Sequence, residues 1–169
     1  MARRTVRPIV RKGNEFRINL DAEEIGLIRR LLNELRTLLM GSSDDERLVR
    51  LFPTAYHNET DRELDAEYQR LMREELVASR LSGIATLDRA FDEISEKTGR
   101  KDKAQLTLDQ LMAFMQAVNG LRLVLGTMLD VGEEHDLDEL GDDHPLIGEH
   151  RLYVYLSWIL ECSVEALQG

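Results

Sequence analysis

The chain has 169 residues, of which 43% are hydrophobic and 32% are charged, and it carries a formal net charge of −10. These proportions indicate one globular domain over residues 1–169 and exclude a disordered chain. A single cysteine, Cys162, excludes a disulfide framework and a Cys-based zinc site, which fits a reducing cytoplasm.

No uninterrupted apolar run reaches the ~18 residues that span a bilayer, and the N-terminus lacks the apolar core of a secretory signal. We therefore expect a cytoplasmic protein that does not enter a membrane. Among the first 20 residues, six basic residues stand against Glu15, which gives this arm a local charge of +5. Residues 130–150 contain nine acidic residues and no Lys or Arg.

An acidic body repels the phosphate backbone of nucleic acid, so we expect no direct sequence-specific binding to DNA or RNA. The basic arm, with Arg3, Arg4 and Arg7, is either a solvated tail or a contact for an acidic partner.

Residues 6–20 are predicted to form a β-hairpin, because Phe16, Ile18 and Leu20 alternate with polar residues after a turn at 12–14. A helix is then predicted from Asp21, which can form a capping box with Glu24, to Gly41. A short helical turn at 48–52 should stop before Pro53.

Thr60 and Glu63 suggest a second capping box, followed by a helix that Ser82 and Gly83 should kink or divide. Residues 97–103 form a charged loop.

Thr107 and Gln110 suggest a third capping box at the start of a helix over 108–130. An acidic loop follows over 131–147.

The last predicted helix, 148–167, is apolar nearly all round, which is typical of a buried helix or of a subunit interface, so a homodimer is possible. The expected fold is mainly α: a compact bundle of about five helices (21–169) with a small N-terminal β-hairpin (1–20). The helices 108–130 and 148–167 should pack together.

A polar stripe interrupts the helix 108–130, where Asn119, Arg122, Gly126 and Asp130 share one face. Gly120 and Gly126 each cost about 1 kcal/mol relative to Ala in a helix, so they suggest that another group comes close. Two interpretations stay open. Either Asn119 and Arg122 point to solvent, or Arg122 pairs with Glu161 on the last helix, as a structural pair or part of a partner surface.

His135, His144 and His150 lie among acidic residues, but their spacing matches no known metal motif, and a solvated loop is the simpler interpretation. Cys162 has acidic neighbours in sequence and is best explained as a small core residue. Motifs for nucleophilic catalysis or for nucleotide binding are also missing. We expect no metal, no cofactor and no enzymatic activity.

Three segments carry a family resemblance: 117–129, 144–146 with His144-Pro145-Leu146, and 152–158 ending in Leu156-Ser157-Trp158. They resemble the C-terminal half of an actinobacterial family of oxidative-stress transcription regulators, the AosR-like family, formerly a domain of unknown function. The resemblance spans nearly the whole chain, and it implies a cytosolic regulatory protein that is not an enzyme. Redox sensing in that family rests on a cysteine pair, whereas this chain has only Cys162, which leaves an intermolecular disulfide or an oxidised thiol.

The resemblance implies that the protein modulates oxidative-stress transcription through protein contacts, with a sigma factor or RNA polymerase as the candidate partner. Members of the family are typically encoded beside the protease adaptor ClpS, so an adaptor or accessory factor for Clp proteolysis is the alternative. The basic arm and the acidic loop at 133–143 are the predicted contact surfaces.

Overall fold

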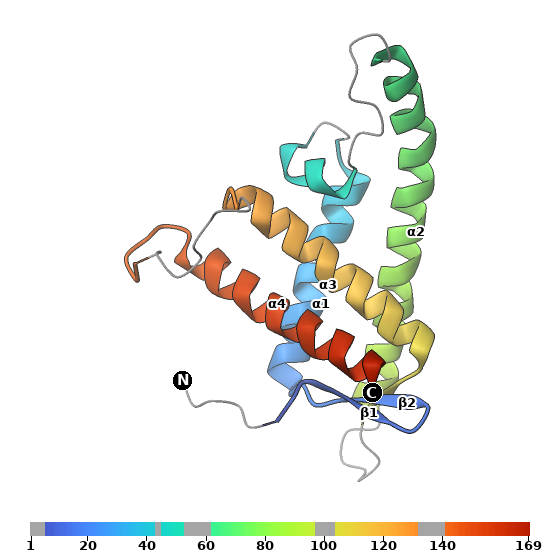
Figure 1. Cartoon of the computed structure of the whole chain (residues 1–169), viewed down its shortest axis with the longest axis vertical. Helices are drawn as coiled ribbons and strands as arrows, with labels where there is room; N and C mark the ends of the chain where they lie inside the picture. The colour runs from blue at the N-terminus through green and yellow to red at the C-terminus, as the bar shows by residue number, and fades with distance from the viewer. Residues whose placement is uncertain (1–5, 43–44, 53–61, 97–103, 132–140) are drawn as a thin grey trace.

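The computed structural model describes residues 6–42, 45–52, 62–96, 104–131 and 141–169. In these ranges the chain forms a small sheet at one end of a helical body (Figure 1). The expected mainly α fold with an N-terminal hairpin is confirmed. The basic residues Arg3 and Arg4, and most of the acidic loop, lie outside the described residues.

The hairpin consists of β1 (Ile9–Lys12) and β2 (Glu15–Ile18), which pair antiparallel. Gly13 adopts a φ of 64°, the left-handed conformation that a tight turn requires and that glycine accepts without strain. A two-residue strand that we did not predict, β3 (Gln105–Leu106), extends the sheet in the order β1-β2-β3. It places Leu106 opposite Phe16, and both side chains are buried.

Helix α1 (Ala22–Met40) begins and ends where the sequence predicts. The Asp21 carboxylate accepts the backbone N–H of Glu24, and the Glu24 carboxylate accepts the N–H of Asp21, which completes the capping box. Gly41 follows the last residue, and its N–H bonds the Leu38 carbonyl. Ile28, Leu32, Leu35 and Leu39 form the buried stripe of this helix.

The predicted helical turn is a 3₁₀ helix, η1 (Glu46–Leu51). Asp45 caps it by accepting the N–H of Arg47, and the Arg47 guanidinium binds the same carboxylate. These hydrogen bonds from Arg47 lower the pKa of Asp45 to about 2. Leu48 and Leu51 are buried, so η1 lies fixed on the helical body.

Helix α2 (Arg62–Glu96) runs 35 residues without a break, so the predicted division at Ser82 and Gly83 is wrong. A glycine inside a helix weakens it by about 1 kcal/mol but does not end it. Ile84, Leu87 and Phe91, in the turns that follow, are fully buried and hold α2 against the body. The N-terminal half of α2 projects beyond the body (Figure 1), and its Leu64 and Leu71 are exposed. The predicted cap at Thr60 lies outside the described residues.

Helix α3 (Leu108–Met128) is the centre of the fold, because it packs against α1, α2, η1 and α4. Thr107 and Gln110 form the predicted capping box. Leu111, Phe114, Val118 and Leu121 are buried, and Phe114 meets Phe91 of α2 edge to face at 6.4 Å. Burying each large apolar side chain stabilises the fold by about 1.5–3 kcal/mol.

By length and mean hydropathy (1.3), α3 could also cross a membrane, but half of that window is buried inside the fold, as is usual for a core helix. The last helix, α4 (Ile147–Gln168), packs along α3 as predicted (Figure 1). It is not the central helix: Leu156 and Ile159 face the core, whereas Val154 and Val164 are exposed.

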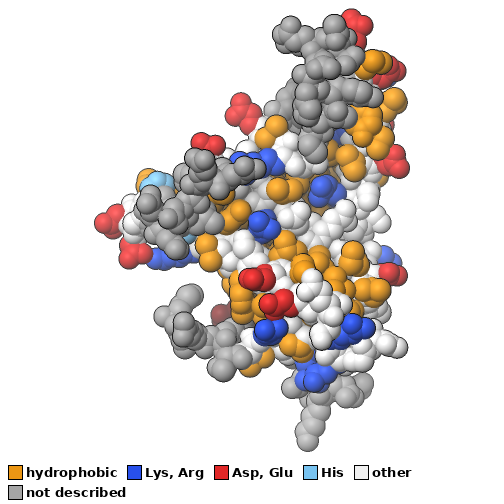
Figure 2. Space-filling view, viewed as in Figure 1, with side chains coloured by type: hydrophobic (Ala, Val, Ile, Leu, Met, Phe, Trp, Pro, Cys, Tyr) orange, Lys and Arg blue, Asp and Glu red, His pale blue; other side chains and the backbone are white. Residues whose placement is uncertain are grey.

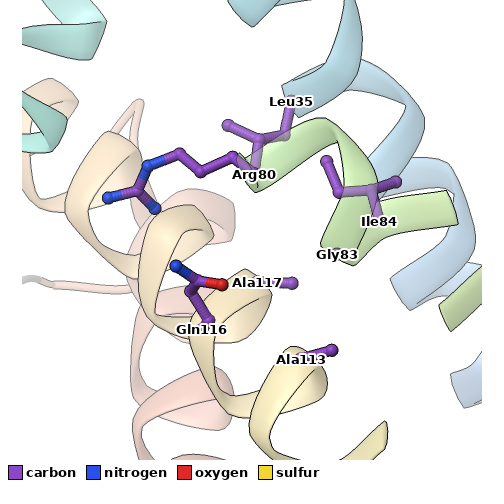
Figure 3. A pocket seen from close by; sticks show the side chains of 7 residues that line it. All are labelled: Leu35, Arg80, Gly83, Ile84, Ala113, Gln116 and Ala117. Atoms are coloured by element: carbon purple, nitrogen blue, oxygen red, sulfur yellow. The ribbon is translucent and has the colours of Figure 1, made fainter. Parts of the chain in front are cut away.

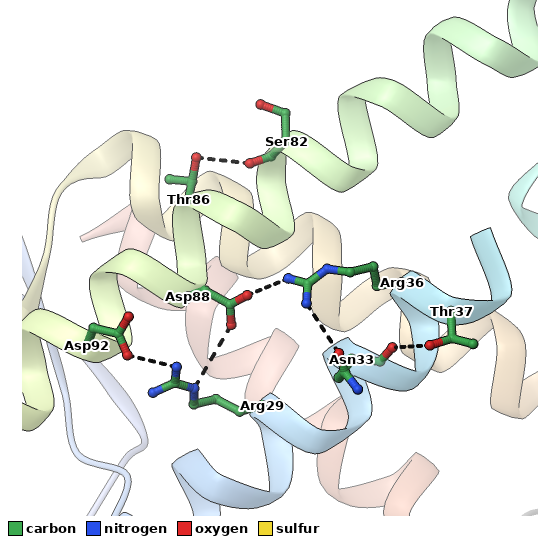
Figure 4. A network of polar contacts seen from close by, with 8 residues as sticks. All are labelled: Arg29, Asn33, Arg36, Thr37, Ser82, Thr86, Asp88 and Asp92. Carbon is green, nitrogen blue, oxygen red and sulfur yellow. Dashed lines mark hydrogen bonds and ion pairs between the residues drawn. The ribbon is translucent and has the colours of Figure 1, made fainter. Parts of the chain in front are cut away.

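A polar network joins α1 to the C-terminal half of α2 on the side away from α3 (Figure 4). The Asp88 carboxylate pairs with Arg36 and lies 4.0 Å from Arg29, which also binds Asp92 at 2.8 Å. The guanidinium groups of Arg29 and Arg36 are half-buried, so their carboxylate partners offset the cost of removing these charges from water.

We predict that Asp88→Asn lowers the free energy of unfolding by about 1 kcal/mol, because two half-buried cations lose charge partners. The control Asp92→Asn changes the more exposed member of the network and should cost less than about 0.5 kcal/mol. Urea unfolding measures both. Equal losses would contradict the greater weight given to Asp88.

Candidate functional site

The described part of the basic arm is bound to the fold. Arg7 forms an ion pair with Glu165 of α4 at 2.6 Å, and its carbonyl accepts the Asn19 side-chain amide. Arg11 donates to the Leu167 carbonyl near the C-terminus of α4. Together they line an open groove of about 490 Å³ between β1 and α4. Because Arg7 has an acidic partner within the chain, it is less available to another protein.

Cys162 lies on the core side of α4 and is 5% exposed. Burial raises the pKa of its thiol most, and the nearby carboxylate of Glu165 raises it further; Arg7 partly offsets this, and Glu161 adds the smallest increase. A thiol with a raised pKa is mostly protonated at neutral pH, so it reacts slowly with oxidants. Its predicted role as a small core residue agrees with this burial.

Slow thiol chemistry gives a direct prediction. The native protein should react with a disulfide reagent such as dithiobis-nitrobenzoate at least about tenfold more slowly at pH 7.5 than the urea-unfolded chain. Absorbance of the released thiolate follows both reactions. Equal rates would show that Cys162 is accessible in the native state and restore it as a redox candidate.

The predicted ion pair between Arg122 and Glu161 is wrong. No ion pair between described residues joins them; instead the Arg122 guanidinium lies 5.4 Å from the ring centre of Tyr153 and 3.4 Å from its hydroxyl. Tyr153 is eight residues before Glu161, a rise of about 12 Å along α4. Asn119 and Arg122 are half-buried, so they do not simply point to solvent, as the first interpretation expects. Glu161 is exposed and does not pair with Arg122, as the second interpretation expects.

We therefore expect the double variant Arg122→Met with Glu161→Gln to lose stability by the sum of its single variants within about 0.3 kcal/mol, because the two residues do not interact. Thermal or urea unfolding of the four proteins completes the cycle. A coupling energy above about 0.5 kcal/mol would reinstate the pair.

The histidines do not form a metal site in the described residues, where no group of three His, Cys, Asp or Glu side chains converges. His144 accepts the Leu146 N–H through Nδ1 and shapes the turn before α4. Asp142 pairs with Arg151, and His150 is buried on α4, where its Nε2 atom has no hydrogen-bond partner among the described residues. His135 and Asp136 lie outside the described residues.

Gly120 and Gly126 of α3 have close neighbours from other elements, as we expected from the presence of glycine inside a helix. A Cβ atom on Gly120 would lie 3.4 Å from Nη1 of Arg80, and one on Gly126 would lie 3.0 Å from Nη1 of Arg50. Figure 3 shows Arg80 reaching from α2 toward α3, above a niche of about 10 Å³, which is about the smallest volume that one water molecule needs.

The turn that follows α3 fixes the position of Arg50. Asp130 adopts a φ of 52°, a left-handed conformation that Asp tolerates, and the Val131 N–H then bonds the Gly126 carbonyl. This turn presents the Val131 carbonyl to Arg50, which donates to it at 2.7 Å. Arg50 is thereby held over the C-terminal end of α3, where the helix dipole favours a cation.

Arg50, Arg80 and Arg122 together form what we term the arginine face. No carboxylate of a described residue forms an ion pair with any of them. Burial lowers the pKa of Arg80, and the buried Nε atoms of Arg80 and Arg122 have no hydrogen-bond acceptor in the described structure. On the α1 side of α2, by contrast, half-buried arginines are paired with Asp88 and Asp92.

Figure 2 shows Lys and Arg side chains gathered in the middle of the face that α3 crosses, with acidic side chains over α4 and at the edges. This surface is positively charged, although the whole chain carries a net charge of −10. No local sequence pattern indicates this surface, because its residues come from η1, α2 and α3, which are far apart along the chain.

The described residues define a mainly α-helical domain with a small N-terminal sheet. Residues 4–167 match the family described as "Domain of unknown function (DUF2017)", so the chain belongs to that family. The AosR-like resemblance is confirmed by proteins named "Oxidative stress regulator AosR" from Mycobacterium bovis and from two strains of Mycobacterium tuberculosis.

Each of these relatives is 34% identical over 79 residues, which are 47% of this chain and 34% of the relative. The match thus spans about a third of the length of the relatives. No solved structure matches the chain. The relatives support a regulatory role in broad terms.

Proposed function

We propose that this protein is a non-enzymatic cytoplasmic regulator that modulates transcription under oxidative stress by contacting another protein. The observation that carries the proposal is the similarity to relatives named as oxidative stress regulators. The partner we propose for this role is a sigma factor or RNA polymerase.

The surface chemistry supports a protein partner over nucleic acid. A net charge of −10 disfavours approach to a long phosphate backbone. The arginine face is small and is flanked by partly exposed apolar residues of α3, including Met112. Protein interfaces combine these features, with arginine, methionine and tyrosine enriched in them.

The regulation, on this proposal, does not depend on oxidation of Cys162. The thiol is buried, its pKa is raised, and the sequence holds no second cysteine with which to form an internal disulfide. The oxidant signal would then reach the complex through the partner, or through a change in the amount of this protein.

A deletion strain complemented with a tagged gene tests the proposal. We expect transcripts after peroxide treatment to differ between the deletion strain and the wild type, and the wild-type gene and Cys162→Ala to restore them equally. Purification of the tagged protein under both conditions, with an untagged strain as control, should enrich RNA polymerase subunits or a sigma factor.

Enrichment of Clp components with unchanged transcripts would contradict the proposal and favour the adaptor function. Loss of restoration in Cys162→Ala, with normal levels of folded protein, would contradict the redox-independent part.

A further inference from the structure

The outward side of α3 carries apolar side chains beside the polar residues Asn119 and Arg122. Leu108 and Met112 are each 51% exposed, and Met115 and Leu123 are half-buried. These four residues form one stripe on a single helix face. The polar residue Asn119 interrupts the stripe, and it ends at Gly126, which is buried beneath Arg50 and Tyr153. Methionine side chains adapt to varied partners, which suits a contact surface.

The arginine face lies at the C-terminal end of this stripe. Arg80 lies over Gly120 and Arg50 over Gly126, and these glycines are about 9 Å apart along the helix axis. Arg122 lies beside Tyr153 at the edge toward α4. The surface therefore begins with apolar side chains and ends with three cations that have no carboxylate partner among the described residues.

We propose that this surface, the apolar stripe of α3 with Arg50, Arg80 and Arg122, binds an acidic amphipathic helix of a protein partner. From Leu108 to Gly126, over which Arg50 lies, the surface is about 27 Å long, which matches a partner helix of about 18 residues. Carboxylates two turns apart in that helix are about 11 Å apart along its axis, close to the axial separation of about 9 Å between Gly120 and Gly126, over which Arg80 and Arg50 lie. The apolar residues of the partner helix then cover Met112 and Leu108.

Charge selects this occupant over nucleic acid. A long polyanion extends over the acidic surroundings of the arginine face, whereas a short acidic helix places its carboxylates on the arginines and its apolar side chains on Met112 and Leu108. The half-buried guanidinium groups of Arg80 and Arg122 gain most from a carboxylate, because they have already lost part of their hydration. Apolar partner residues gain from covering Leu108 and Met112, which a phosphodiester backbone does not.

The inference rests on the proposed function for its partner class, and a peptide of defined composition tests it separately. The probe is a fluorescein-labelled peptide of about 18 residues with Leu at helical spacing, Glu on both flanks of the Leu stripe and Ala elsewhere. Its twin has Gln in place of every Glu. Fluorescence anisotropy at about 0.15 M salt measures binding to the full chain.

The test variant is Arg50→Gln/Arg80→Gln/Arg122→Gln. Its matched control, Arg30→Gln/Arg70→Gln/Arg89→Gln, removes the same charge from three exposed arginines outside the surface, none of which makes an ion pair with a described residue. Met112→Glu is a second test at an exposed position, so its fold should persist. Circular dichroism checks the fold of each variant.

We expect saturable binding of the Glu peptide by the wild type and the control, and binding at least about tenfold weaker for the test variant, for Met112→Glu and for the Gln peptide. Equal weakening in the control, absence of binding by the wild type, or tighter binding of a 20-base-pair duplex would overturn the inference. A dimer in light scattering that only the test variants break would make a second copy the occupant and overturn it too.

The two proposals fail in different ways. Peptide binding without any effect on transcription would remove the proposed function and leave the surface. Normal transcriptional regulation by the triple arginine variant, with no peptide binding by the wild type, would remove the surface and leave the function.

Discussion

Helix α3 carries nine buried residues, and the rest of the fold is arranged to cover it. α1, α2, η1 and α4 all pack on α3, and β3 pairs with the hairpin directly before it begins. This covering is incomplete, because the outward stripe with Leu108 and Met112 stays half-exposed. Gly120 and Gly126 let guanidinium groups lie against the helix where side chains would otherwise stand. Packing of the core and the chemistry of the surface thus come from the same helix.

Local signals were enough to predict most of the elements. The capping boxes at Asp21 and Thr107 involve residues three positions apart, so sequence spacing alone determines them. The hairpin turn at Gly13 is equally local. Gly83 misled the prediction because a glycine's effect depends on its surroundings, and the buried residues that follow hold α2 continuous. The two-residue strand β3 forms only by pairing with distant Phe16, so no local pattern indicates it.

Contacts between helices could not be predicted in the same way. Arg122 was assigned to Glu161 because that acid interrupts an apolar helix, but the position of α4 along α3 brings Tyr153 to it instead. The arginine face combines three elements separated by up to 72 positions in the chain, and the overall negative charge conceals it. Cys162 was placed correctly in the core from its apolar helix, whereas the rise in its pKa comes first from burial in the folded state and then from the nearby carboxylate of Glu165.

The central claim is that the outward surface of α3 is where this protein meets its partner. Hydrogen exchange followed by mass spectrometry, on the chain alone and in the complex purified from cells, tests it most directly. The account predicts slower exchange on binding in η1 and in the parts of α2 and α3 around Arg80 and Gly120, with little change in α1. Protection confined to the hairpin and the α4 C-terminus, around Arg7 and Arg11, would contradict it.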